Sequence, residues 1–531
     1  MSTSKHRNQP EPNHTKLYSV IGIIVCIAIA AILIWNSGAL RSNADAVTIG
    51  DETFSVADVD FYYYTLRNNE ANTAAMYAQY GIPYNFDYNI ADELQMYDEE
   101  RTYAEYFMDE TLAQMQTIKV LCDEAEAAGF ELSEEVEASY AGSLSSLEAQ
   151  ITYASLMRGS SERSYIQALY GPHANMAMLK DKLREQTIAG EYAIYISDGF
   201  TYEDADLEAY YEENTLDLDT FAYRSILVPA AAPVPEIDDI TGMEIPVTEE
   251  QAAAAMEEAK VNAEELAERV RSGEDFNTAA MDYVGETEQA SLADPEFAYT
   301  GNQLGTGLAP LFKTWIADED ATVGDIGVLE DSSANGYYVV SLLSRERDDS
   351  AREKASVYSA IFIAETLVNA DNLLPLPTEE ELAAAYAKAE AFEAEWEQTA
   401  DRTEEVFQTL ISAALAEATP ATEEETPSDQ PVSPISQVLF DVTPAGYGAA
   451  FDAFVFGANR AVGDSAIVDM EESDGSVSGA RYIYISDLGP IRWMGAAETA
   501  LRTADYDAFL EALKELAPIE RLAGLAEVRV I

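Results

Sequence analysis

Hydrophobic and polar positions change their period along the 531-residue chain, and each change marks a different kind of segment. The first segment is an uncharged apolar run, Tyr18–Trp35, which as a helix is long enough to cross a bilayer. Between residues 97 and 195, apolar positions recur every three or four residues, as in amphipathic helices. From Phe221 onward, β-like runs alternate with helical segments. The pattern predicts an N-terminal transmembrane helix, a helical domain and then α+β modules.

Helix boundaries in the first half of the chain are marked by capping residues. Residues 47–64 open with a short β-like segment, after which Ser55 is a predicted N-cap. Gly129 ends a predicted helix at the position where a left-handed residue is favoured. Ser133 is the predicted N-cap of the next helix. These signals place several helices one after another before the β-like runs begin.

The first α+β module covers residues 216–349. It begins with the predicted strand Phe221–Val228, and a long amphipathic helix is predicted over residues 249–272. A glycine-bearing loop at Gly301–Gly307 precedes an apolar helix face. The module closes with two further strand candidates, Val323–Leu329 and Tyr337–Leu343.

The segment after residue 350 repeats this module in degraded form. Tyr223–Val228 matches Tyr358–Ile363, and Phe276 matches Phe407. The clearest match is one of spacing, because six positions align without a gap to six later ones: Phe312, Trp315, Ile316, Val323, Gly324 and Asp325 to Phe451, Phe454, Val455, Val462, Gly463 and Asp464. Residues 419–435 are rich in Pro, Thr and Glu and predict a disordered insertion within the second copy.

These patterns divide the chain into five expected parts. They are a cytoplasmic tail (1–16), a transmembrane anchor (17–36), a helical domain (47–215), an α+β module (216–349) and its degenerate repeat (350–531). Lys and Arg precede the anchor, so the positive-inside bias puts the N-terminus in the cytoplasm. We therefore expect a single-pass protein of the cell membrane with an extracytoplasmic body.

Two other interpretations of the N-terminal run remain open. Ala44-Asp45-Ala46 has the small-x-small pattern of a signal-peptide cleavage site. Cys26 suggests a lipidation site, although nine core residues follow it where lipidation cysteines end the apolar run. Cleavage or lipidation would replace the transmembrane anchor but would leave the body outside the cytoplasm.

Composition removes several classes of function. The net charge is −67, from 97 acidic and 30 basic residues, so the surface repels nucleic acid and other polyanions. Cys122 is the only cysteine after the anchor, so the body has no internal disulfide. No zinc spacing, phosphate-binding glycine loop or nucleophile motif occurs. We expect neither a cofactor nor a metal.

Five short motifs in the first module occur in the order found in a known family. They are Arg224–Val228, Gly273–Phe276, Gly301–Gly305, Gly324–Gly327 and Gly336–Val340. In these motifs the chain resembles parvulin-type peptidyl-prolyl isomerases, and with its helical first domain it resembles the SurA- and PrsA-like exported foldases. The resemblance implies a membrane-anchored folding factor whose partners are unfolded or newly exported polypeptides.

The resemblance also names candidate site residues. Parvulins usually carry two histidines in the first and last strands of the module, and here Ser225 and Tyr338 occupy those positions. Glu286 lies near the position of the family's Cys or Asp. The family's apolar proline pocket corresponds to Leu304, Leu308 and Phe312. Neither repeat contains a histidine, because the three in the chain are His6, His14 and His173.

Two functions remain open at this point. Hydroxyl groups on Ser225 and Tyr338 can donate hydrogen bonds to a twisting prolyl amide, which would retain isomerase activity. Alternatively, the chain is an inactive pseudo-isomerase that acts as a chaperone or binding scaffold, in which Leu304, Leu308 and Phe312 are core residues. The aromatic residues between Tyr62 and Tyr88 have the same ambiguity, since they suit either a core or a groove for extended polypeptide.

Overall fold

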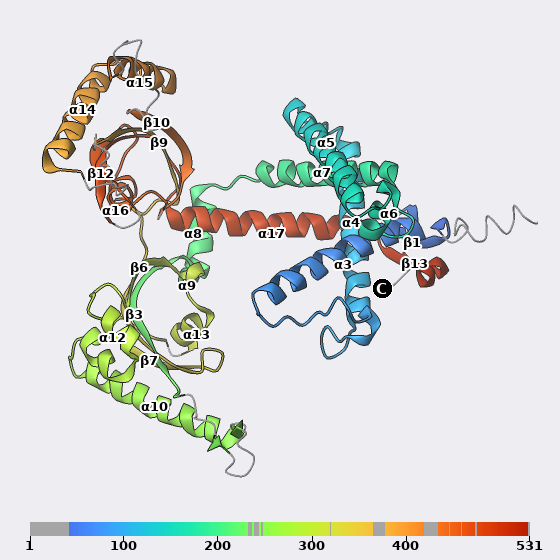
Figure 1. Cartoon of the computed structure of the whole chain (residues 1–531), viewed down its shortest axis with the longest axis horizontal. Helices are drawn as coiled ribbons and strands as arrows, with labels where there is room; N and C mark the ends of the chain where they lie inside the picture. The colour runs from blue at the N-terminus through green and yellow to red at the C-terminus, as the bar shows by residue number, and fades with distance from the viewer. Residues whose placement is uncertain are drawn as a thin grey trace, which may run out of the picture. The chain divides into compact units, whose positions relative to one another are not determined.

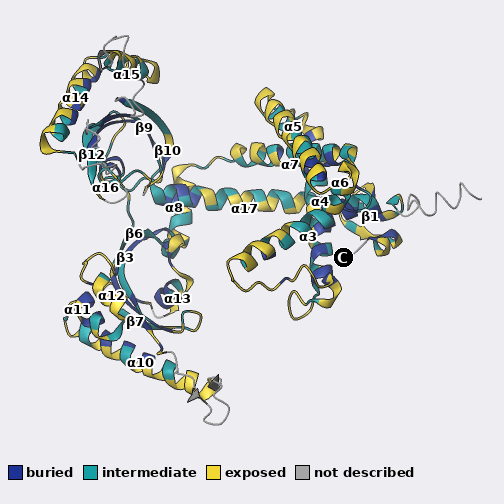
Figure 2. Cartoon of the chain, viewed as in Figure 1, coloured by how far each residue is buried: buried dark blue, intermediate teal, exposed yellow. Residues whose placement is uncertain are grey.

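The computed structural model describes residues 42–231, 236–237, 244–245, 248–318, 320–364, 377–418, 434–444, 446–457, 459–472 and 475–528. The chain divides into two compact units, Met1–Thr201 with Arg502–Ile531 and Tyr202–Leu501. Figure 1 labels their helices and strands, and Figure 2 shows their burial. The predicted anchor and nearly all of the predicted insertion lie outside the described residues. No helix within the described ranges is long and apolar enough to span a membrane.

The first unit is a set of helices beside a small antiparallel sheet. The sheet has the strand order β13-β1-β2, and its residues pack into one core with α3, α4, α6 and α7. Its helices and strands are β1 (Asp45–Ile49), β2 (Glu52–Ser55), α3 (Val56–Gln79), α4 (Tyr103–Ala128), α5 (Glu134–Met157), α6 (Glu162–Tyr170), α7 (Met176–Gly199) and β13 (Ile519–Arg521), with short 3-10 turns at η1 (Asp92–Leu94) and η4 (Ala523–Glu527).

The predicted capping residues lie at the helix ends. Ser55 precedes α3 and forms a full capping box with Asp58, whose carboxylate accepts the Ser55 N–H at 3.0 Å. Gly129 follows α4 in the left-handed conformation, with φ of 67°. Ser133 caps α5 by accepting the Val136 N–H at 3.2 Å. Local sequence therefore sets where these helices begin and end.

The end of the chain belongs to the first unit, which differs from the expectation that it closes the second repeat. Strand β13 pairs antiparallel with β1, with Val47 opposite Arg521 and Ile49 opposite Ile519. The last helix, α17 (Arg492–Leu516), starts in the second unit, and its residues from Arg502 onward belong to the first. A strand of three residues lacks a clear periodic signal, so its pairing with a strand more than 470 residues earlier was missed.

The second unit contains two α+β modules after the short helices α8 (Asp204–Glu213) and α9 (Thr215–Leu218). The first module has a four-stranded antiparallel sheet of order β6-β3-β8-β7, with α10 and α13 on its opposite faces. Its elements are β3 (Thr220–Pro229), β4 (Glu236–Ile237), β5 (Glu244–Ile245), α10 (Glu249–Arg271), α11 (Phe276–Ala280), η2 (Met281–Tyr283), α12 (Glu286–Ser291), β6 (Tyr299–Leu304), η3 (Gly305–Gly307), α13 (Pro310–Asp318), β7 (Ile326–Asp331) and β8 (Gly336–Glu346).

The second module has the same topology at the place where the residue spacing predicts a repeat. Its sheet order is β10-β9-β12-β11, which corresponds strand by strand to β6-β3-β8-β7. Its elements are β9 (Ala355–Ile363), α14 (Glu379–Glu397), α15 (Glu404–Ala418), β10 (Ile435–Val442), α16 (Ala449–Val455), β11 (Ser465–Glu471) and β12 (Val477–Leu488). The mixed α+β class predicted from the sequence is confirmed.

The same turn precedes the third strand of both sheets. Gly324 and Gly463 both have φ of 98°, a conformation that a residue with a Cβ rarely adopts. Gly324 donates its N–H to the Leu342 carbonyl and Gly463 donates to the Ile485 carbonyl, both at 2.8 Å. Aspartates at the next position cap the two turns alike. The conserved spacing of the two copies thus reflects a turn that needs glycine.

The predicted alignment of the first strands is wrong by one residue. In the structure Tyr223 lies opposite Leu342, whereas the equivalent Ile485 lies opposite Val357 and not Tyr358. Both sheets have the same bulge, at Leu343 of β8 and at Ser486 of β12, so the one-residue difference lies in the predicted alignment and not in the ladders. Because side chains alternate between sheet faces, a slip of one residue moves each of them to the other face. Tyr223 therefore packs on the α13 face, while Tyr358 packs in the core beneath α14.

Candidate functional site

Ser225 and Tyr338 lie on the face of the first module's sheet that α13 covers. Ser225 pairs with Val340 across β3 and β8, and Tyr338 pairs with Leu227 two positions along. The two residues are therefore diagonal neighbours on one face, at backbone positions about 7–8 Å apart. The structure brings this predicted pair together.

The space above this pair is filled by side chains. Phe312 of α13 is 6% exposed and makes edge-to-face contacts with Tyr338 and Tyr223, each with ring centroids 5.5 Å apart. Leu308 is 5% exposed in the same cluster, with Trp315 and other apolar residues. Thus Leu308 and Phe312 lie in a closed core, and the ring of Tyr338 packs against Phe312 on the same sheet face.

The other two predicted site residues lie elsewhere. Leu304, the last residue of β6, is half-buried against a different cluster that contains Leu207 and Trp493. Glu286 is exposed at the first residue of α12, in a segment whose apolar neighbours pack on the α10 face. Of the predicted loop, Gly301–Leu304 belongs to edge strand β6, and Gly305 begins the 3-10 turn η3. The structure therefore does not assemble all the family-derived residues into one pocket.

Exposed apolar side chains gather instead at the end of α3 and in the connection that follows it. Leu94 is 79% exposed and Tyr80 is 72% exposed. We define the α3–α4 surface as the nine large apolar residues here whose side chains face solvent: Met76, Tyr80, Ile82, Tyr84, Tyr88, Ile90, Leu94, Met96 and Tyr97. Such a dense exposed apolar set is typical of an interaction site.

The connection that carries this surface is anchored by a buried ion pair. Asp92 is fully buried, and its carboxylate accepts hydrogen bonds from Arg67 Nε at 3.2 Å and from the Tyr63 hydroxyl at 3.0 Å. Burial raises the pKa of Asp92, and it raises the pKa of Tyr63 as well. Phe86 is buried against Tyr103 of α4. The backbone between α3 and α4 is therefore held in place while its apolar side chains point outward.

Some aromatic residues of this region pack in the core and others are exposed, so both roles that the sequence left open occur. Tyr62, Tyr63 and Phe86 are core residues, whereas Tyr80, Tyr84 and Tyr88 are exposed. Sequence periodicity did not separate the two sets, because the connection is irregular. Asp92 was the available signal that the connection is ordered. In the sequence alone it looks like an acidic residue that faces solvent, and its role becomes clear only from its ion pair with Arg67.

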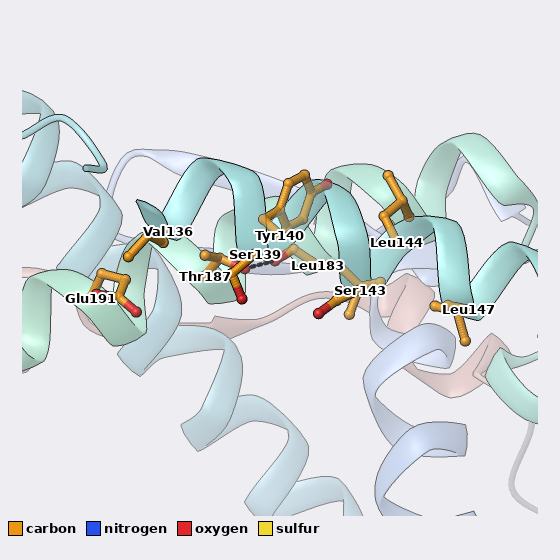
Figure 3. Close-up of a pocket in the computed structure, with 9 residues that line it drawn as sticks. All are labelled: Val136, Ser139, Tyr140, Ser143, Leu144, Leu147, Leu183, Thr187 and Glu191. Atoms are coloured by element: carbon orange, nitrogen blue, oxygen red, sulfur yellow. Dashed lines mark hydrogen bonds between the residues drawn. The ribbon is translucent and has the colours of Figure 1, made fainter. Parts of the chain in front are cut away.

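A hollow lies between α5 and α7 of the first unit. It has a volume of about 330 Å³, and its lining combines three leucines with polar residues such as Ser139 and Thr187. Figure 3 shows Tyr140 of α5 beside Leu183 of α7, with Leu144 and Leu147 farther along α5. The Tyr140 hydroxyl donates to the Lys180 carbonyl at 3.1 Å, which fixes its ring at the rim. The hollow therefore has a mixed lining of apolar and polar side chains.

Foldases and chaperones are among the solved structures that are similar to this chain. PrsA peptidylprolyl isomerases match the chain at 14% identity and a TM-score of 0.22 for Bacillus anthracis, and at 16% and 0.23 for Bacillus cereus. The matches cover 59% and 64% of this chain and 99% and 96% of the two PrsA chains. A SurA-like chaperone from Campylobacter jejuni matches at 14% identity and a TM-score of 0.15, over 41% of this chain and 79% of its own.

No family model matches the chain, and no curated protein matches it. Solved structures similar to this chain include PrsA isomerases and a SurA-like chaperone.

Proposed function

We propose that this protein is an extracytoplasmic folding factor that binds unfolded, newly exported polypeptides through the α3–α4 surface. The proposal rests on the exposed apolar residues of this surface together with the buried Arg67–Asp92 ion pair that holds their backbone in place. Apolar contact gives affinity without requiring a particular client sequence, at about 25 cal/mol for each Å² removed from water. The buried Arg67–Asp92 pair keeps the surface ordered, so less conformational entropy is lost when a client binds.

The side chains of the first module favour binding over isomerisation. Prolyl isomerisation crosses a barrier of about 18–20 kcal/mol and needs a desolvated pocket that favours the twisted amide. Here the corresponding face is covered by Phe312 and Tyr338, and both usual histidines are replaced. We therefore propose a pseudo-isomerase that has kept the fold as a scaffold.

Two assays on the full-length chain test this proposal together. We expect the chain to suppress aggregation of an unfolded client and to leave the isomerisation rate of a proline peptide near its uncatalysed value. The variant Tyr80→Ser/Leu94→Ser/Met96→Ser should lose most of the suppression, whereas Val261→Ser, which alters an exposed apolar residue of α10, should not. Efficient isomerisation that Ser225→Ala/Tyr338→Phe abolishes would contradict the proposal and support an active enzyme.

Membrane attachment through residues 17–36 is a further part of the proposal. An uncharged run of this length inserts as a helix, while Lys16 and the other preceding cations stay in the cytoplasm. In fractionated cells we expect the chain to resist alkaline extraction and its body to be digested by protease added outside. Replacing Ile27 and Ile29 by Asp should release it from the membrane. Release of the unaltered chain by alkali would show that the run is cleaved or does not insert.

A further inference from the structure

A buried arginine without a counter-ion lies in the second module. Arg481 of β12 is 4% exposed, and its Nη2 donates to the Met470 sulfur at 3.2 Å. Its guanidinium carbon lies 5.3 Å from the Phe451 ring centroid and 5.9 Å from that of Tyr447. Its Nε and Nη1 have no hydrogen-bond partner, and no carboxylate of the described residues forms an ion pair with it.

Two further polar groups on the same sheet face lack partners. Ser359 is fully buried, and its hydroxyl makes no hydrogen bond. Gln437 lies directly opposite Ser359 across β10 and β9, and its buried side-chain oxygen is likewise unpartnered. Ser359 also pairs with Ile483, two residues from Arg481, so Ser359 and Arg481 are diagonal neighbours on the face that α16 covers. Three neighbouring strands thus carry unpartnered polar groups on one sheet face.

Without a bound partner, these buried polar groups lower the stability of the folded module. An uncompensated buried charge costs several kcal/mol, and a buried hydroxyl or amide without a partner adds to that cost. The two rings contribute cation–π attraction but carry no negative charge to balance the guanidinium. Glu471, which follows Met470 on β11, accepts the Ala450 N–H at the start of α16. Burial also lowers the pKa of Arg481, although a guanidinium remains charged at any physiological pH.

We propose that the second module binds a small inorganic or carboxylate anion between α16 and its sheet, held by Arg481 Nε or Nη1 and by the Ser359 hydroxyl. Both side chains are almost completely enclosed, which favours a small anion over a polypeptide segment. The amide of Gln437 supplies a further donor when its nitrogen is turned toward the anion. The site occupies the strand positions equivalent to Tyr338 and Ser225 of the first module, and it does not depend on the proposed client binding.

The site is tested by amide hydrogen exchange of the full-length chain in a formate or chloride buffer. The reference is a buffer of a bulky sulfonate at the same ionic strength. At an anion concentration 100 times the dissociation constant, we expect the exchange of β12 and α16 amides to slow by about 100-fold in the wild type. Arg481→Met should remove this response without lowering protection in the sulfonate buffer, because methionine needs no counter-ion. Arg402→Met is the matched control, since Arg402 lies over Tyr484 but is exposed, and it should keep the response.

Ser359→Ala keeps the charge and removes one donor, so it should weaken the response severalfold even if Arg481→Met fails to fold. An unchanged response in Ser359→Ala would overturn the proposed ligand set. No difference between formate or chloride and the sulfonate in the wild type would overturn the anion site itself.

Discussion

Replacing Asp92 by Ala is expected to destabilise the first unit by about 3–5 kcal/mol, because it leaves the buried Arg67 guanidinium without its counter-ion. The substitution also removes the acceptor of the Tyr63 hydroxyl. Urea denaturation of the full-length chain, followed by hydrogen exchange of α3 and α4 amides, measures the loss. Since Asp92 anchors the connection beneath the α3–α4 surface, we expect client binding to weaken in the same variant before the unit unfolds.

Two variants make the first prediction specific. Asp92→Asn should cost less than Asp92→Ala, because the amide still accepts from Tyr63 although Arg67 stays charged. Glu148→Ala removes a surface ion pair with Lys180 in the same unit, and its effect on stability should be small because solvent screens the pair. An equal loss of stability in Asp92→Ala and Glu148→Ala would show that the buried pair does not anchor the connection.

Replacing Phe312 by Ala is expected to destabilise the first module by about 3–5 kcal/mol, as for other large aromatic residues removed from a core. The cost arises from the cavity left between Tyr223, Tyr338 and α13. Denaturant unfolding monitored by hydrogen exchange in β3 and β8 measures it. Val323→Ala is the control, because Val323 is exposed in the following turn and should change stability by no more than about 0.5 kcal/mol.

The same variant distinguishes a core from a proline pocket. A residue that lines an open pocket gains little from its neighbours, so its loss would reduce isomerisation while leaving the unfolding free energy nearly unchanged. A stability loss below about 1 kcal/mol for Phe312→Ala, together with a measurable isomerase activity that it abolishes, would place Phe312 in a catalytic pocket.

Sequence reasoning reached the topology because turns and spacing are local properties. The match of Gly324 with Gly463 was visible in the chain, since both turns require positive φ, and their strands follow at fixed distances. The register of β9 was not visible, because Tyr223 and Tyr358 look equivalent in the sequence although they turn toward opposite sheet faces. The pairing of β13 with β1 was missed for a similar reason, since it joins the two ends of the described chain.

The candidate site was predicted less well than the fold. Motif positions identified Ser225 and Tyr338 as neighbours, and the register places them on one face. Apolar residues look alike in a sequence whether they line a groove or fill a core, so the closure of Leu308 and Phe312 needed the structure. Arg481 was overlooked because a single arginine in a strand normally faces solvent, and only its burial without a carboxylate makes it a candidate.

The affinity of the full-length chain for a permanently unfolded polypeptide, made once with prolines and once without, tests the binding proposal most directly. We expect the two polypeptides to bind with similar dissociation constants, and Tyr80→Ser/Leu94→Ser/Met96→Ser to weaken both by at least about tenfold, or 1.4 kcal/mol. Ser225→Ala/Tyr338→Phe should bind as the wild type does. Binding that requires proline and is lost in Ser225→Ala/Tyr338→Phe, but not in the α3–α4 surface variant, would contradict the proposal.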